Sequence, residues 1–174
     1  DSDDSKRFVS AQVDGINIIG IYLPNGQNLE SDKFPFKLNW MERLLAHLKD
    51  RYDPSEPLVM VGDFNLCPSP LDHHWEESER GRSIFTTEEE RSRYQALLDW
   101  GLTDAYRHIN PDKQAFTWWD YRAGAWERNK GLRIDHILVP QPLVERIESV
   151  VVHAMVRGQP LPSDHVPGML TLAD

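Results

Sequence analysis

The segment from residue 8 to residue 23 constrains the fold of this chain more than any other. Asp14-Gly15 stands between two apolar runs, and this dipeptide is typical of a two-residue β-hairpin turn. We therefore expect antiparallel strands at about 8–13 and 16–23. The second strand carries isoleucine on both of its faces. A strand that is apolar on both faces belongs in a sheet that is covered on both sides.

Helices and short strands follow along the rest of the chain. Apolar residues at spacings of three and four predict a helix at about 32–50. A capping box formed by Thr87 and Glu90 predicts a second helix that ends near Trp100. Further strands are expected at 58–61, 117–119, 134–139, 148–155 and 168–172, with a long surface loop at 67–85. Hairpins with occasional helices indicate sheets packed on each other with helices outside, and the alternative is a doubly wound α/β sheet.

Length and composition indicate one ordinary globular domain over residues 1–174. No apolar stretch approaches the roughly 20 residues of a membrane span, so no membrane partner is expected. The single cysteine, Cys67, excludes a disulfide framework and a zinc site built from several cysteines. The net charge of −9 argues against a chain that holds polyanions by its overall charge. A nucleic-acid partner would therefore need a local basic patch or bound cations.

Polar side chains recur where the expected strands end. They are Tyr22, Asn25, Asp63, Asn65, Asp135, Asp164 and His165. Carboxylates, carboxamides, a phenol and an imidazole suit Mg²⁺ or Mn²⁺ better than zinc. Because Mg²⁺ commonly takes one or two protein carboxylates together with phosphate oxygens, this inventory indicates phosphoryl chemistry.

Each of these features alone also has a purely structural explanation. The sequence Gly-Asp-Phe-Asn at 62–65 is typical of a turn, and Tyr22 could be a core aromatic with a hydrogen-bonded hydroxyl. Asp135 lies in an apolar strand, where a buried carboxylate needs a partner, and His165 is the expected partner. The paired histidines at 73–74 are expected at the surface.

Five motifs follow one another in a fixed order. They are Tyr-Leu-Pro-Asn-Gly at 22–26, Gly-Asp-Phe-Asn at 62–65, Thr-Trp-Trp-Asp-Tyr at 117–121, Gly-Leu-Arg-Ile-Asp-His at 131–136 and Ser-Asp-His at 163–165. Together they closely resemble the exonuclease III family of abasic-site DNA endonucleases, within the endonuclease/exonuclease/phosphatase superfamily. The resemblance covers about residues 8–174. Family members begin with an earlier segment that holds a strand-end Asn and a metal-ligating Glu, so the chain resembles the C-terminal two-thirds of such an enzyme.

The resemblance implies a four-layer α/β sandwich, with two mostly antiparallel sheets face to face and helices outside. It implies a catalytic group of Tyr22, Asp63, Asn65, Asp135 and His165. Asp63 would act as general base or acid on the attacking water, which Asn65 would orient. His165, steadied by Asp135, would contact the scissile phosphate. The implied ligands of Mg²⁺ or Mn²⁺ are Asp63, Asn65, Asp164 and His165.

The resemblance also implies the substrate. Trp118, Leu132 and Ile134 would form the pocket for a flipped-out baseless sugar. Asn25 would contact the DNA, and Arg133 would grip phosphates as part of a basic loop at 122–133. The implied activity is Mg²⁺-dependent hydrolysis of double-stranded DNA 5′ to abasic sites, with 3′–5′ exonuclease and 3′-phosphatase activity at 3′ ends. A cytoplasmic monomer is expected.

The sequence leaves open two alternatives to a DNA nuclease. The first is a superfamily phosphodiesterase that acts on lipid or small phosphate esters. The second is an inactive truncated fragment or DNA-binding remnant, which would expose apolar surface.

Overall fold

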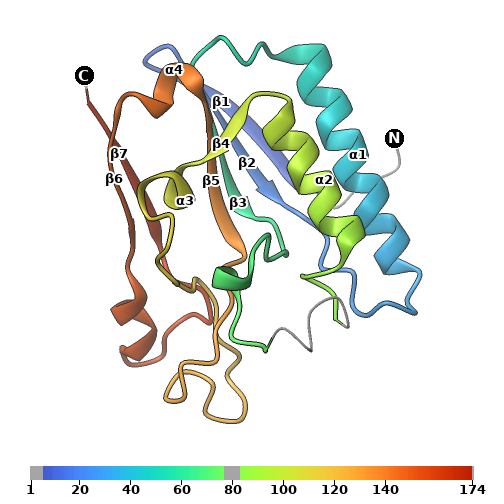
Figure 1. Cartoon of the computed structure of the whole chain (residues 1–174), viewed down its shortest axis with the longest axis vertical. Helices are drawn as coiled ribbons and strands as arrows, with labels where there is room; N and C mark the ends of the chain where they lie inside the picture. Colours follow the sequence, from blue (N-terminus) through green and yellow to red (C-terminus); the bar gives the residue numbers. More distant parts are fainter. Residues whose placement is uncertain (1–5, 77–82, 174) are drawn as a thin grey trace.

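A mixed five-stranded sheet forms the centre of the structure, a computed structural model that describes residues 6–76 and 83–173 (Figure 1). Across the sheet the strands are β1 (Phe8–Val13), β2 (Ile16–Tyr22), β3 (Leu58–Asp63), β5 (Asp135–Pro140) and β4 (Leu102–Asp104). Only β2 and β3 pair in parallel, and the other neighbours are antiparallel. The strands expected at 8–13, 16–23, 58–61 and 134–139 are therefore confirmed.

The turn between β1 and β2 has the backbone that its sequence predicts. Asp14 and Gly15 have φ values of 48° and 80°. A type I′ turn requires positive φ at both central residues, which Asp and Gly tolerate better than other residues. The hairpin prediction is confirmed.

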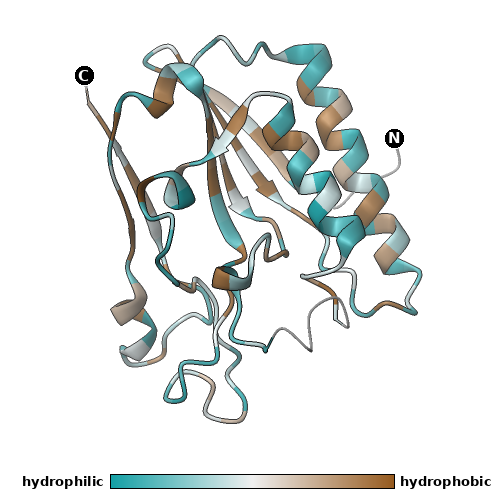
Figure 2. Cartoon of the chain, in the orientation of Figure 1, coloured by the Kyte–Doolittle hydropathy of each residue, from teal (hydrophilic) through white to brown (hydrophobic). Residues whose placement is uncertain are grey.

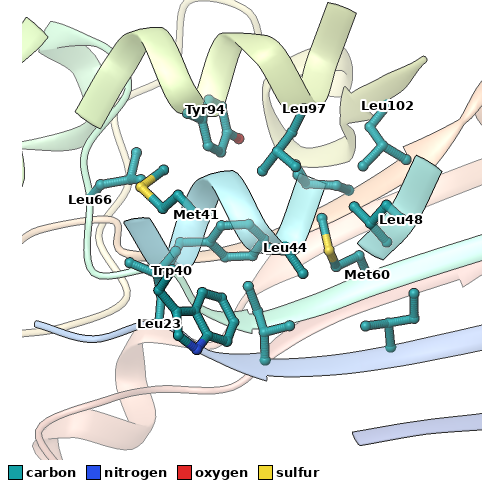
Figure 3. Packing of buried hydrophobic residues seen from close by; sticks show 14 of the residues in the cluster. Leu23, Trp40, Met41, Leu44, Leu48, Met60, Leu66, Tyr94, Leu97 and Leu102 are labelled. Carbon is teal, nitrogen blue, oxygen red and sulfur yellow. The ribbon is translucent and has the colours of Figure 1, made fainter. Parts of the chain in front are cut away.

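Helices α1 (Lys33–Arg51) and α2 (Glu88–Asp99) cover one face of this sheet. Figure 2 shows hydrophilic and hydrophobic residues along each helix, as in amphipathic helices. Figure 3 shows apolar side chains of both helices packed on those of the strands. The Thr87 capping box is present, which explains why α2 begins where the sequence predicts. The buried face of α1 also includes one charged residue, Lys37.

A two-stranded antiparallel sheet, β6 (Ile147–Val152) and β7 (Gly168–Leu172), packs on the opposite face. Two short helices, α3 (Ala105–Ile109) and α4 (Gln141–Val144), lie in the same region. Two facing sheets with helices outside confirm the expected mixed α/β sandwich, and the doubly wound alternative is wrong.

The expectation that β2 is covered on both faces is only half right. Its helix-facing residues Ile19 and Ile21 are buried. On the opposite face, Val9, Val13 and Ile18 are 67%, 50% and 36% exposed. The reason is that β7 packs against β5 and β6 packs against α3, and of the described hairpin residues Ile16 is the one that joins their apolar cluster.

Two local predictions are wrong. Residues 117–119 form no strand, because Trp118 makes only isolated bridges, with Leu132 and with His165. The segment 67–85 is not simply a surface loop: a 3₁₀ turn spans Pro70–Asp72, and His73 is buried. Residues 77–82 of that segment lie outside the described part. A second 3₁₀ turn, Ala154–Gly158, follows β6. None of the described helices has the length and apolar character required to cross a lipid bilayer.

Candidate active site

The polar residues predicted at strand ends meet at one end of the sandwich. Tyr22 pairs with Asp63 in the β2–β3 register, and Asp63 pairs with Asp135 in the β3–β5 register. Paired residues point to the same face of a sheet, so these side chains share the face that looks toward the second sheet. The loop before β7 brings His165 to the same place, where its ring contacts Asp135.

The backbone after β3 is shaped by two residues with positive φ. Gly62 has a φ of 141°, and a Cβ there would lie 1.9 Å from the carbonyl oxygen of Ile21. Only glycine fits at this position. Asn65 follows with a φ of 49°, in the left-handed region that asparagine tolerates better than most residues. The Gly-Asp-Phe-Asn motif is thus a turn, as its structural explanation predicts, and it also aims Asp63 and Asn65 at the site.

Asn65 holds the Asp63 carboxylate on both oxygens. Its backbone N–H donates to Asp63 Oδ1 at 2.8 Å and its Nδ2 donates to Oδ2 at 2.9 Å. The same Nδ2 reaches the carbonyl oxygen of Leu23 at 2.9 Å. Asn25 Nδ2 donates to Asn65 Oδ1 at 2.9 Å. Asn25 is therefore placed beside Asn65, and both side chains are fixed by neighbours.

Asp135 and His165 form the second pair of the site. His165 Nδ1 lies 2.9 Å from Asp135 Oδ2, so His165 is the partner that Asp135 requires. The Thr117 hydroxyl accepts hydrogen bonds from the backbone N–H groups of Ile134 and Asp135, each at 3.1 Å. The hydrogen bond to Asp135 is the main cause that raises the pKa of His165. An imidazolium is thereby favoured where a phosphate would be held.

Asp63 is the titrating group of the site. Burial, and then the negative charge of Asp135, raise its pKa to about 7, although the Asn65 amide and His165 act in the opposite direction. A carboxyl group that titrates near neutral pH can both accept and return a proton. The geometry therefore suits Asp63 to general acid–base work.

We expect Asp135→Asn to lower the pKa of His165, because the carboxylate that stabilises the imidazolium is removed. A ¹H NMR titration of the His165 ring protons measures this change. Asp120→Asn is the matched control, because the Asp120 carboxylate is paired with Arg122, whereas His165 is hydrogen-bonded to Asp135. Equal His165 titration curves in the parent chain and in Asp135→Asn would contradict the pairing.

The residues expected to receive the sugar lie together in a packed apolar cluster. Leu132 and Ile134 are buried, and Trp118 packs against them and remains partly exposed. The Trp118 indole N–H donates to Asp164 Oδ2 at 3.0 Å, which connects this cluster to the Ser-Asp-His motif. Trp75 and Phe85 also pack on the cluster. Sequence patterns did not indicate those two residues, since they lie in a segment without strand or helix periodicity.

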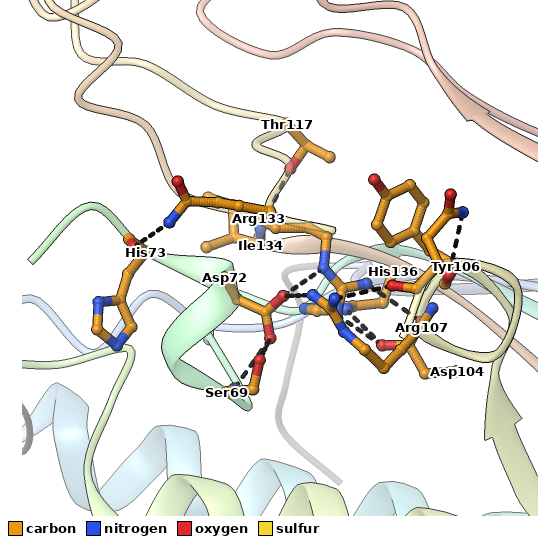
Figure 4. Close-up of polar contacts among 12 residues, drawn as sticks. Ser69, Asp72, His73, Asp104, Tyr106, Arg107, Thr117, Arg133, Ile134 and His136 are labelled. Atoms are coloured by element: carbon orange, nitrogen blue, oxygen red, sulfur yellow. Dashed lines mark hydrogen bonds and ion pairs between the residues drawn. The ribbon is translucent and has the colours of Figure 1, made fainter. Parts of the chain in front are cut away.

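The prediction that Arg133 grips DNA phosphates is wrong. Its side chain is 1% exposed. Its Nε lies 2.7 Å from Asp72 Oδ1, and its terminal nitrogens lie 3.1 and 2.7 Å from the two oxygens of Asp104 (Figure 4). A buried guanidinium needs such carboxylates to compensate its charge. The Arg133 guanidinium is therefore enclosed and is not accessible to a ligand.

The basic loop at 122–133 is also less available than expected. Arg122 is paired with Asp120 at 2.8 Å, and Arg128 bonds to carbonyl oxygens of its own loop. Arg128 and Lys130 nevertheless line a groove of about 950 Å³ together with His74, Trp75 and one acidic residue, Glu76. Two cations against one carboxylate leave this groove with a positive balance beside the apolar cluster.

The donor set can be compared with the requirements of Mg²⁺. No group of three or more His, Cys, Asp or Glu side chains among residues 6–76 and 83–173 is placed to hold a metal ion. Asp63 and Asp135 nevertheless lie side by side, and their mutual repulsion is part of what raises the pKa of Asp63. Mg²⁺ takes one or two protein carboxylates and completes its octahedron with water and phosphate oxygens. The residues present fit that mode of binding.

Comparison with known proteins agrees with this geometry. The sequence profile of the endonuclease/exonuclease/phosphatase family matches residues 5–165. The chain therefore belongs to the endonuclease/exonuclease/phosphatase family.

Its relatives lie in the exonuclease III branch. Exodeoxyribonuclease III of Haemophilus influenzae is 38% identical over 95% of this chain, and the exodeoxyribonuclease of Bacillus subtilis is 31% identical over 95%. The chain spans 66% and 63% of the length of these two proteins.

Solved structures show the same fold. A 3′ phosphatase from Neisseria bound to a product DNA hairpin superposes with a TM-score of 0.93, at 35% identity over 99% of this chain and 66% of that one. An AP endonuclease from Archaeoglobus fulgidus also gives 0.93, at 35% identity over 99% of this chain and 68% of that one.

Proposed function

We propose that this protein is a Mg²⁺-dependent (or Mn²⁺-dependent) DNA phosphodiester hydrolase of base-excision repair. It would cleave 5′ to abasic sites and act on 3′ ends as an exonuclease and a 3′ phosphatase. The observation that carries the proposal is the convergence of Asp63, Asn65, Asp135 and His165 from separate parts of the chain. The relatives named exodeoxyribonuclease, and the structural neighbours named AP endonuclease and 3′ phosphatase, support it.

In the proposed reaction, Asp63 removes a proton from a water molecule whose oxygen bonds to phosphorus. The bond between phosphorus and the 3′ oxygen breaks, and the 3′ oxygen leaves as a hydroxyl after it takes up a proton from solvent. The Asn65 carboxamide orients that water, and His165, held by Asp135, donates to the phosphate oxygens. Tyr22 lies next to Asp63 and would contact the same phosphate. A divalent cation held at the Asp63–Asp135 pair would supply charge stabilisation of the transferring group when bound. Of the wider ligand set that the resemblance implies, His165 does not fit, because an imidazolium is a donor and has no lone pair for a metal. These roles are assigned by correspondence with the family motifs.

The proposed substrate is double-stranded DNA at abasic sites and 3′ ends. The cluster of Trp118, Leu132 and Ile134 would receive a baseless sugar, which is cheaper to flip out than an intact nucleotide. The groove with Arg128 and Lys130 would follow the phosphates without reading sequence. This basic groove beside an apolar cluster favours DNA over lipid or small phosphate esters. The expected monomeric state and cytoplasmic location belong to the same proposal.

We expect the chain to cleave a duplex with one abasic site in the presence of MgCl₂ and to lose that activity in EDTA, because the metal offsets charge on the transferring phosphoryl group. Gel electrophoresis of an end-labelled duplex measures the cleavage. An identical duplex without the lesion and one with a 3′-phosphate separate the three expected activities.

Bis-p-nitrophenyl phosphate serves as a generic phosphodiester in the same assay. Hydrolysis of this ester without cleavage of the abasic duplex would favour the alternative phosphodiesterase. Absence of both reactions would overturn the proposal for this chain.

A further inference from the structure

Lys37 is a fully buried lysine that the proposed reaction does not use. It lies on α1 with 0% of its side chain exposed. Its Nζ donates to the carbonyl oxygen of Asn65 at 2.6 Å and to that of Asn25 at 3.3 Å. A third contact is an ion pair with Glu90. An ammonium has three N–H donors, so each of them has an acceptor.

Glu90 is equally well satisfied. Its carboxylate accepts from the backbone N–H groups of Phe85 and Thr87 and from the Thr87 hydroxyl. The same side chain therefore completes the cap of α2 and neutralises Lys37. Because neither residue reaches solvent, the ion pair joins α1 and α2 inside the protein, directly behind the loop that follows β3.

The two carbonyl groups that Lys37 binds belong to the two asparagines of the site. Asn65 has a positive φ, and this backbone turns its carbonyl oxygen toward α1 while its side chain faces Asp63. Asn25 is tied to Asn65 by a side-chain hydrogen bond. One buried ammonium therefore holds the backbone of both residues that surround Asp63.

We infer that Lys37 is a positioning residue of the proposed reaction: it fixes Asn65 and Asn25 so that Asn65 keeps the Asp63 carboxylate in its working orientation. The kinetic part of this inference rests on the proposed nuclease function. If the role of Lys37 were purely structural, its loss would lower only the stability of the protein, because the charge of Glu90 would be uncompensated. The two roles are separable, because the charge on Glu90 can be removed independently.

The test compares Lys37→Met with the double variant Lys37→Met/Glu90→Gln. The single variant leaves an unpaired buried carboxylate, and we expect its Tm to fall by about 10 °C. The double variant carries no buried charge at the pair, keeps an acceptor for the Thr87 backbone, and should recover most of that loss. Its kcat on the abasic duplex should still be about 10²-fold below the parent with little change in KM, because Asn65 is misplaced.

A second readout does not depend on cleavage. In ¹⁵N-labelled protein, we expect the side-chain amide signals of Asn65 and Asn25 to shift and to lose exchange protection in the double variant, while amides of β5 keep theirs. The matched control is Arg93→Met/Glu42→Gln. This exposed pair, at 2.5 Å, joins the same two helices away from the two asparagines, and its removal should alter neither readout.

Parental amide signals of Asn65 and Asn25 in the double variant would overturn the inference, as would a parental kcat. If the parent chain itself does not cleave the abasic duplex, the proposed function fails. The amide measurement then decides the positioning role on its own.

Discussion

Replacement of Asp63 by asparagine is expected to reduce cleavage of an abasic duplex by about 10³-fold or more, with binding of that duplex largely retained. Asparagine occupies nearly the same volume but cannot take a proton from the attacking water. The surfaces proposed to hold DNA, Trp118 and the groove at Arg128 and Lys130, are not altered. Cleavage is measured by gel assay and binding by fluorescence anisotropy of a labelled duplex in Ca²⁺.

The same substitution should change how stability depends on pH. The pKa of Asp63 is about 7 in the folded chain, against a reference value of 3.8. Between these values the folded state binds more protons than the unfolded state, so the free energy of unfolding falls as pH rises from about 4 to about 7. The shift of roughly 3 units corresponds to at most about 4 kcal/mol. Asp63→Asn should lack this fall.

The parent and the Asp63→Asn variant must be compared by the slope of the free energy of unfolding against pH and not by its absolute value. The new amide places an NH₂ group opposite an N–H donor of Asn65, which lowers stability equally at every pH. His165 has a raised pKa, so its contribution to stability is also lost as pH rises. Its main cause, the hydrogen bond to Asp135, is present in both proteins, and the smaller effect of the Asp63 charge is lost in the variant, which flattens the slope in the same direction. Denaturant unfolding at a series of pH values without divalent cations measures the difference. Parallel curves for parent and variant, or equal cleavage, would contradict the role of Asp63.

Substitution of Arg133 by methionine is expected to destabilise the chain by about 3–5 kcal/mol and to lower Tm by about 10 °C. The variant removes the cation that Asp72 and Asp104 share. Asp72 keeps its ion pair with Arg107, whereas Asp104 keeps neutral donors, such as the Tyr94 hydroxyl, and carries most of the penalty. Burial alone would raise the pKa of each carboxyl, yet the charge of Arg133 holds both pKa values below the usual range. Thermal unfolding followed by circular dichroism measures the loss.

The pH dependence of this effect has a definite sign. A carboxylate with a depressed pKa contributes stability above its unfolded pKa and loses that contribution as pH falls. The penalty of Arg133→Met should therefore shrink below about pH 4, where protonation of the carboxyls removes their need for a cation.

Arg122→Met is the matched control for Arg133→Met. Its guanidinium forms an exposed ion pair with Asp120, and such pairs contribute little to stability. A weaker affinity for DNA in Arg133→Met with an unchanged Tm would restore the rejected interpretation that Arg133 is a phosphate contact.

Much of the fold was predictable because local chemistry specifies it. Asp14-Gly15 determines the hairpin, the Thr87–Glu90 capping box determines the start of α2, and the apolar runs at β3 and β5 determine buried strands. The strand predicted at 117–119 is wrong because Trp118 packs on the Leu132–Ile134 cluster and makes only isolated bridges. β4 and α3 are too short for their periodicity to be detected in the sequence.

The candidate site could also be predicted only in part. The motif order identified Asp63, Asn65, Asp135 and His165, because residue type and strand-end position are visible in the sequence. Burial of charge is not visible there. Arg133 was predicted to face DNA, and no sequence pattern marked Lys37 as buried, yet each is enclosed by acceptors from distant segments.

By itself, therefore, the sequence determined the local elements, the family motifs and the chemical types of the groups at the site. Only the tertiary structure decided which cations face solvent and which are buried and paired inside the protein. The physical reason is that these two buried cations are enclosed mainly by acceptors that lie more than twenty residues away in the chain. Arg133 meets Asp72 and Asp104 from 61 and 29 positions away, and Lys37 meets Asn65 and Glu90 from 28 and 53 positions away. No local sequence pattern indicates these long-range contacts.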